Sequence, residues 1–100
     1  MNLHPKKLIT IVCEIIARDT LAAQLQDCGA KGYTVSAVEG WGAKGSRFAD
    51  IPEDANIEIK TIVGAEKAER ILARLSTEIM PRFATIACVA DVQVLRADKF

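Results

Sequence analysis

The spacing of apolar residues changes repeatedly along this chain, and the order of these changes is the strongest constraint on its fold. The alternating or continuously apolar, β-branched pattern of strands occurs at residues 7–15, 33–39, 56–63 and 83–95. The three-to-four-residue repeat of helices occurs at residues 19–28 and 65–79, where Gly29 and Pro81 mark the ends. The predicted order is therefore strand, helix, strand, strand, helix, strand.

This order is that of the ferredoxin-like βαββαβ fold, an α+β domain with an antiparallel four-stranded sheet and both helices on one face. One hundred residues form a single domain, 1–100. The segment 7–15 is largely apolar on both of its alternating faces, so it needs cover on both sides. Because the helices cover one face only, the other would leave an apolar patch that monomers avoid. We therefore expect the chain to associate with itself through the open face of the sheet.

Composition excludes several function classes. Thirteen Lys and Arg balance thirteen Asp and Glu, which argues against a nucleic-acid-binding surface, since such surfaces need an excess of positive charge. No apolar run approaches the ~20 residues that span a bilayer. The cysteines Cys13, Cys28 and Cys88 are too far apart in sequence for a typical zinc site and odd in number for a disulfide scaffold. We interpret them as small buried residues in a reducing cytosol.

Residues 40–55 form an unusually long connection between two predicted strands. Connections of this length without regular periodicity are typical of binding loops, although a plain flexible loop is the alternative. Gly40, Gly42 and Gly45 have the G-x-G-x-x-G spacing, but no predicted helix follows them, so the dinucleotide fingerprint does not apply. Ser46-Arg47 likewise replaces the Lys-Ser/Thr of a phosphate loop. Glycine N–H groups with nearby cations can still bind an anion.

Catalysis has little support in the residues. The single histidine, His4, lies in the terminal segment, and no serine or cysteine has a plausible base nearby in sequence. No paired carboxylates or metal-ligand spacings are evident. Lys60 interrupts an apolar strand beside Glu58, where it either forms a surface ion pair or faces an anion. We expect binding rather than turnover.

Several segments resemble the PII signal-transduction superfamily, and together they span nearly the whole chain. They are residues 7–12, Gly-Tyr-Thr-Val at 32–35, the glycine-rich loop base at 40–47 and the segment 92–96. The Gly-Tyr-Thr-Val motif, the loop base and the Val-Leu-Arg-Ala-Asp-Lys-Phe tail are most similar to the PII-like branch associated with bicarbonate transport and carboxysomes. The resemblance implies a homotrimer with adenine-nucleotide sites between neighbouring subunits. It also implies that residues 40–55 are the T-loop, which responds to the ligand and signals to a partner.

The resemblance implies nucleotide contacts for nine residues. Thr34 would lie near the ribose or a phosphate, Ile62 beside the base, and Arg96 would reach a phosphate from the adjacent subunit. Thr85 lies in the segment after the second helix, which would act with strands two and three and the loop base of its own subunit. The loop base would surround the phosphates through Gly42, Ala43, Lys44, Ser46 and Arg47.

Two departures from the nitrogen-regulatory branch narrow the ligand. The segment 82–88, where those members carry a glycine-rich phosphate-binding loop, has no glycine here, so we expect AMP or ADP rather than ATP. The T-loop has no tyrosine, so uridylylation is not expected. The resemblance also implies no response to 2-oxoglutarate, because the Mg-ATP platform that this response uses is incomplete here. The expected function is that of a cytoplasmic, non-catalytic AMP/ADP-binding signalling protein of inorganic-carbon metabolism. Its expected partner is a bicarbonate transporter or a carboxysome-related protein, with bicarbonate as a second ligand. The alternative is a trimeric ferredoxin-like sensor of another small ligand or metal ion, without a nucleotide site.

Overall fold

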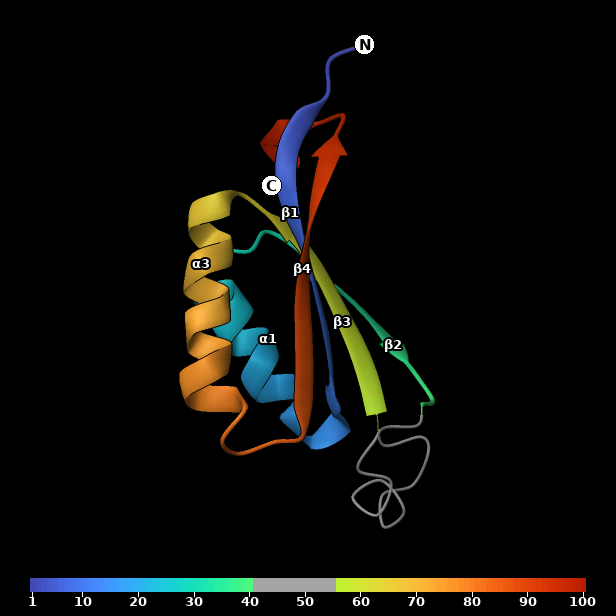
Figure 1. Cartoon of the computed structure of the whole chain (residues 1–100), viewed down its shortest axis with the longest axis vertical. Coiled ribbons are helices and arrows are strands. Elements are labelled where there is room, and N and C mark those ends of the chain that lie inside the picture. The colour runs from blue at the N-terminus through green and yellow to red at the C-terminus, as the bar shows by residue number, and fades with distance from the viewer. Residues whose placement is uncertain (41–55) are drawn as a thin grey trace.

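Two layers, a sheet and a pair of helices, make up the fold in a computed structural model that describes residues 1–40 and 56–100 (Figure 1). The strands are β1 (His4–Glu14), β2 (Thr34–Ala37), β3 (Asn56–Val63) and β4 (Thr85–Val94). The helices are α1 (Arg18–Asp27) and α3 (Ala65–Arg74), and both lie on the same face of the sheet. The predicted βαββαβ order and α+β class are confirmed.

The sheet has the strand order β2-β3-β1-β4, and every neighbouring pair is antiparallel. β1 is central and pairs with β3 from Lys7↔Val63 to Glu14↔Asn56. Its other side pairs with β4 from His4↔Val94 to Cys13↔Thr85. β2 is paired with β3 alone, so β2 and β4 form the two opposite edges of the sheet.

The core lies between the sheet and the helices, because alternate residues of the two central strands face the helical layer. The strands contribute the buried residues Ile9, Ile11, Cys13, Ile57, Ile59 and Val63. The helical segments contribute the buried residues Leu21, Leu25, Cys28, Ala68, Ile71, Leu75 and Ile79. Thr61 is the buried polar residue among these strand positions, and its hydroxyl donates to the Gly32 carbonyl at 2.7 Å. That bond satisfies the Thr61 donor and holds the chain just before β2.

The opposite face of the sheet is not covered by a helix of residues 1–40 or 56–100 (Figure 1). Leu8 and Val12 of β1 alternate with the core residues and are half-buried. Their cross-strand neighbours include Ile62 beside Leu8, and Ile86, which is 69% exposed, beside Val12. One chain therefore covers only one of the two apolar faces predicted for its first strand.

The expectation of three buried cysteines is wrong for Cys88, which lies on β4 and is exposed, whereas Cys13 and Cys28 are buried.

Both helices end with recognisable local structure. Gly29 adopts a φ of 94° directly after α1, and the N–H of Ala30 reaches back to the Leu25 carbonyl at 3.0 Å. This pattern is a Schellman ending, which confirms the role predicted for Gly29.

α3 continues into one wider turn, η3 (Leu75–Ile79), in which the Met80 N–H bonds to the Leu75 carbonyl at 2.9 Å. Within the described residues, no helix is both long and apolar enough to cross a membrane.

Candidate functional site

Five of the nine predicted site residues lie outside the described residues. They are Gly42, Ala43, Lys44, Ser46 and Arg47, together with most of the predicted T-loop, 40–55. The described residues on either side of this segment are the exposed Gly40 and the half-buried Asn56. The four remaining predicted residues are Thr34, Ile62, Thr85 and Arg96.

Thr34 and Ile62 lie on neighbouring strands and on the same face of the sheet. Thr34 is the first residue of β2 and pairs with Lys60 of β3, and Ile62 lies two residues beyond Lys60. Since side chains alternate along a strand, Lys60 and Ile62 both point away from the helices, as Thr34 does. Thr34 is exposed and Ile62 is half-buried. This edge of the open face therefore offers a hydroxyl, an ammonium group and an apolar surface side by side.

Lys60 resolves one question that the sequence left open. Its ammonium group lies 3.4 Å from the Glu58 carboxylate on the same strand, and its side chain is 49% exposed. This is a surface ion pair, which contributes little to stability because water screens it. Lys60 can therefore exchange this pair for an anion at small energetic cost.

Arg96 lies two residues beyond the end of β4, at the start of the C-terminal turn. A guanidinium nitrogen of Arg96 lies 3.7 Å from an Asp98 carboxylate oxygen, and the Arg96 side chain is 66% exposed. The backbone carbonyl of Asp98 accepts a hydrogen bond from Lys31 Nζ at 3.1 Å. Lys31 stands three residues before Thr34, so this bond ties the C-terminal turn η4 (Ala97–Lys99) to the approach to β2.

Thr85 is separated from the other three residues. It begins β4, on the edge of the sheet opposite β2, so three strand spacings of about 4.8 Å lie between Thr85 and the strand of Thr34. Arg96 follows the far end of β4, whose ten residues span about 33 Å. Both separations exceed the reach of a side chain. The structure therefore does not bring the side chains of the four described site residues into contact with one another in one chain.

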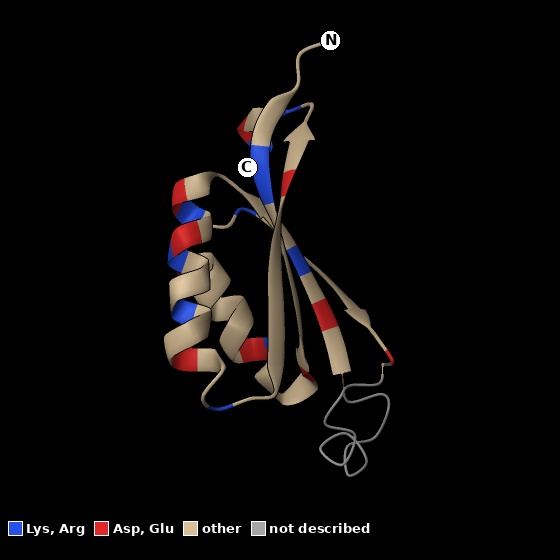
Figure 2. Cartoon of the chain, in the orientation of Figure 1, with Lys and Arg blue, Asp and Glu red and all other residues tan. Residues whose placement is uncertain are grey.

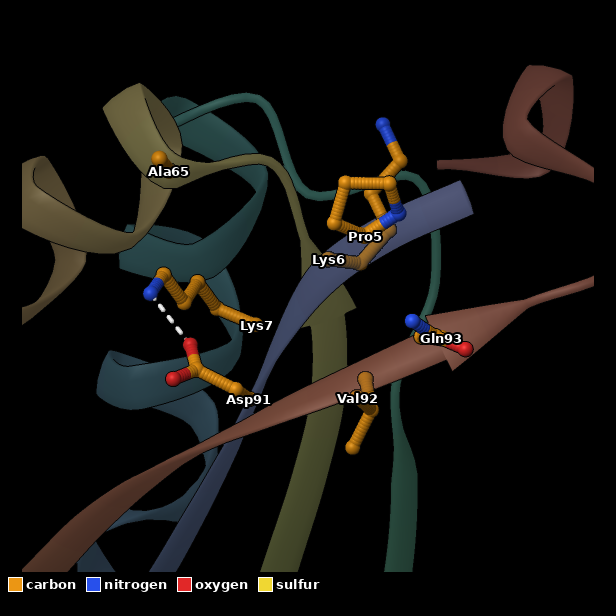
Figure 3. A pocket seen from close by; sticks show the side chains of 7 residues that line it. All are labelled: Pro5, Lys6, Lys7, Ala65, Asp91, Val92 and Gln93. Carbon is orange, nitrogen blue, oxygen red and sulfur yellow. Dashed lines mark hydrogen bonds and ion pairs between the residues drawn. The ribbon is translucent and has the colours of Figure 1, made fainter. Parts of the chain in front are cut away.

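A cavity among the described residues lies elsewhere, at the start of α3. Its volume is about 610 Å³, and it is lined by Pro5, Lys6, Lys7, Ala65, Asp91, Val92 and Gln93 (Figure 3). Lys7 points toward Asp91 of β4 and forms an ion pair with it, while Lys6 points away from that pair. None of the four described site residues lines this cavity. Sequence reasoning missed it, although the Lys6-Lys7 pair at the start of an apolar strand was the available signal.

Charge is distributed differently on the two layers. Acidic and basic residues alternate along α3, whereas the strands carry few charges (Figure 2). On the helical layer, Arg74 donates to Asp27 at 2.6 Å and to Glu78 at 2.9 Å, and these bonds raise the pKa of its guanidinium. Within residues 1–40 and 56–100, the acidic, histidine and cysteine side chains form no group of three or more that could hold a metal ion.

Comparison with known proteins extends over the full length of the chain. Residues 6–99 match the family described as Nitrogen regulatory protein P-II. A structure from Thermus thermophilus, described as a PII-like signalling protein, is 44% identical with a TM-score of 0.84, and the match covers 100% of this chain and 99% of that one. A structure of CPII from Thiomonas intermedia, bound to ADP and bicarbonate, is 28% identical with a TM-score of 0.86, covering 99% of this chain and 97% of that one.

A second CPII structure from the same organism is bound to ADP, AMP and acetate. It is 27% identical with a TM-score of 0.84, and the match covers 100% of this chain and 98% of that one. The family match and the structural matches agree over nearly the same residues. This chain therefore belongs to the nitrogen regulatory protein P-II family and is a PII-like signalling protein.

Proposed function

We propose that this protein binds AMP or ADP without catalysing a reaction on it, and reports the ligand to a partner through residues 40–55. The observation that carries the proposal is the whole-chain similarity to CPII, which is bound to ADP and bicarbonate in a structure with a TM-score of 0.86. Binding can act as a signal only if the ligand prefers one state of the protein over another. The segment between β2 and β3 is our candidate for the part that differs between those states.

The proposed contacts are those that the resemblance to PII-like proteins implies, and the exposure of the described residues supports them. The apolar side chain of Ile62 would pack against the adenine ring, and the exposed hydroxyl of Thr34 would bond to the ribose or a phosphate. Arg96 would pair with a phosphate, because its 3.7 Å contact with Asp98 is too long for a strong hydrogen bond and a phosphate can replace it. Thr85 and the loop-base residues Gly42, Ala43, Lys44, Ser46 and Arg47 would complete the phosphate contacts.

We further propose that three copies assemble around the open face of the sheet, with the nucleotide between neighbours. Two observations support this assembly. The open face exposes Ile86 and half-exposes Leu8 and Val12, so association would remove apolar surface from water. In addition, Thr85 and Thr34 lie at opposite edges of the sheet, so a neighbouring copy could add further contacts, such as Arg96, to a ligand bound at either edge.

Calorimetric titration with AMP, ADP, ATP and cyclic AMP tests the ligand. We expect AMP and ADP to bind more tightly than ATP, because the segment 82–88 lacks the glycines that would let its backbone approach a third phosphate. Product analysis after incubation with ATP or ADP should show no turnover. Absence of binding by all four ligands at millimolar concentration contradicts the proposal.

The carbon-metabolism role rests on the second ligand in the same CPII structure. CPII is bound to bicarbonate together with ADP, and Lys44 and Arg47 are cations that could hold this second anion here. We propose that the protein acts in the cytoplasm and that its partner is a bicarbonate transporter or a carboxysome-related protein. Titration of ADP with and without bicarbonate tests the coupling of the two ligands. We expect the affinity for ADP to change, and identical affinities would contradict the coupling.

A further inference from the structure

The Glu14 side chain forms a long-range hydrogen bond instead of a local capping bond. It is the last residue of β1 and precedes the short turn η1 (Ile15–Ala17). Glu14 occupies the N-cap position of that turn, but its side chain forms no capping bond there. Its carboxylate oxygen Oε1 instead accepts a hydrogen bond from the backbone N–H of Ala84 at 3.0 Å, seventy residues further along the chain.

The geometry of the sheet explains this long-range bond. Backbone pairing between β1 and β4 ends at Cys13↔Thr85. The next residues in register would be Glu14 and Ala84, but β1 turns into η1 immediately after Glu14. Ala84 is only 7% exposed, so water gives little compensation for its N–H. The Glu14 carboxylate therefore replaces the main-chain carbonyl that the neighbouring strand no longer provides.

The same contact fixes the segment that leads into β4. The Thr85 hydroxyl donates to the Phe83 carbonyl at 2.9 Å, and the Phe83 N–H bonds to the Ile79 carbonyl at 2.9 Å. Residues 83 and 84 thus depend on a few specific hydrogen bonds, whereas Thr85 is the first residue of β4 that pairs with β1. Of these bonds, the one from Ala84 to Glu14 is the link to the central strand of the sheet.

We propose that Glu14 is a positioning residue for nucleotide binding, which holds residues 83–85 so that the Thr85 hydroxyl can exchange its bond to the Phe83 carbonyl for one to a phosphate group. The inference rests on the proposed function, because it takes Thr85 as a phosphate contact. Glu14 acts through the Ala84 N–H and does not touch the ligand, since its negative charge would repel a phosphate at contact distance. The role depends on the reach of the side chain and on its acceptor oxygen, not on its charge.

Three substitutions of Glu14 test whether ADP binding depends on the length of this side chain or on its charge. Glu14→Gln keeps the length and an acceptor oxygen but removes the charge, whereas Glu14→Asp keeps the charge but shortens the side chain by one methylene. Glu14→Ala removes the contact altogether. We expect ADP to bind Glu14→Gln as it binds the wild type, and to bind Glu14→Asp and Glu14→Ala about tenfold more weakly. Glu14→Asp retains the charge and most of the side chain, so it keeps the test usable if Glu14→Ala fails to fold.

Adenosine, which lacks phosphate, and Asp27→Ala are the controls. Asp27 is an exposed carboxylate that accepts from Arg74 on the helical layer, so its loss should leave ADP binding unchanged. Adenosine affinity should be the same in all Glu14 variants, because only the phosphate contact is displaced. Thermal unfolding of each variant measures any general loss of stability.

These measurements test the positioning role of Glu14 separately from the proposed nucleotide-binding function. Wild-type affinity for ADP in Glu14→Asp and Glu14→Ala overturns the positioning role, and so does an equal loss for adenosine and ADP. Weak ADP binding by Glu14→Gln would show that charge, not reach, matters, which also contradicts the inference. Failure of the wild-type protein to bind ADP would overturn the proposed function itself and this inference with it.

Discussion

Cys13 and Cys88 lie on neighbouring strands but in opposite environments. Cys13 is 1% exposed on the helix-facing side of β1, whereas Cys88 lies exposed on β4. Burial, and to a smaller extent the nearby Glu14 carboxylate, raise the pKa of the Cys13 thiol to about 11. At neutral pH this thiol is therefore uncharged and packs as a small apolar group, not as a nucleophile.

The raised pKa of Cys13 predicts a loss of stability in alkaline solution. An unfolded chain loses the Cys13 proton near pH 9.0, whereas the folded chain keeps it until about pH 11. The contribution of this thiol to the free energy of unfolding is therefore complete below pH 9.0 and declines as the pH rises toward 11. Urea unfolding of the wild type and Cys13→Ala, from neutral pH upward, should show a stability difference that shrinks over this range. A difference that stays constant with pH would contradict the prediction.

The secondary-structure elements match the predicted ones in order but not in every bound, since β1 begins at His4 and not at the predicted residue 7. β3 lies between β1 and β2, and its bounds, Asn56–Val63, are the predicted ones. β2 pairs on one side only and spans Thr34–Ala37, shorter than the predicted 33–39. The second helix was predicted as one unit over 65–79, but its last turn is a π turn, Leu75–Ile79. The apolar repeat continues through that turn, since Leu75 and Ile79 are both buried, so periodicity gave no sign of it.

Replacing Gly29 tests the ending of α1. Gly29→Ala would place a Cβ on a residue with φ of 94° and 3.2 Å from the Lys67 side chain. We expect the free energy of unfolding to fall by about 1 kcal/mol, mainly from backbone strain, because the end of the Lys67 side chain can move. Gly32→Ala is the matched control, since its Cβ would meet no atom within 4 Å and its φ is not positive. Urea unfolding measures both, and equal effects would contradict the backbone explanation.

The whole molecule has one covered and one uncovered sheet face, which is why we expect it to function as an assembly. The helices bury the odd-numbered residues of the central strands, such as Ile9, Ile11 and Ile59. The even-numbered residues Leu8 and Val12 keep an apolar surface that one chain does not cover. Two of the described site residues, Thr34 and Thr85, lie on the opposite edge strands of the same sheet. Association of several copies would cover the apolar face and would add site residues from neighbouring copies.

A charge on the open face tests the assembly. Ile86 is 69% exposed in one chain, so Ile86→Glu should cost the fold of the chain little but should disrupt contacts between copies. We expect native mass measurement to give three times 10.9 kDa for the wild type and 10.9 kDa for Ile86→Glu. Ile16→Glu is the control, because Ile16 is 71% exposed but lies on the turn η1 rather than on the sheet. It should retain the wild-type mass, and a wild-type monomer would contradict the proposed trimer.

Sequence reasoning predicted the candidate site less fully than the fold. The resemblance of the sequence to PII-like proteins suggested nucleotide contacts for Thr34, Ile62, Thr85 and Arg96, but nothing local showed that Thr85 begins the strand farthest from Thr34. The contact between Glu14 and Ala84 had no signal at all, since it joins residues seventy positions apart. It exists because β4 pairs with β1 in a register that ends one residue before Glu14.

The sequence by itself determined the number, type and order of the elements, because apolar periodicity records which side of each element must be buried. It also determined that one sheet face would stay apolar, since the pattern of 7–15 is visible without any structure. Only the tertiary structure decided which strands form the edges, which side chains meet across the sheet and which cysteine is exposed. Those properties depend on strand order and register, which are fixed by contacts between residues far apart in the chain.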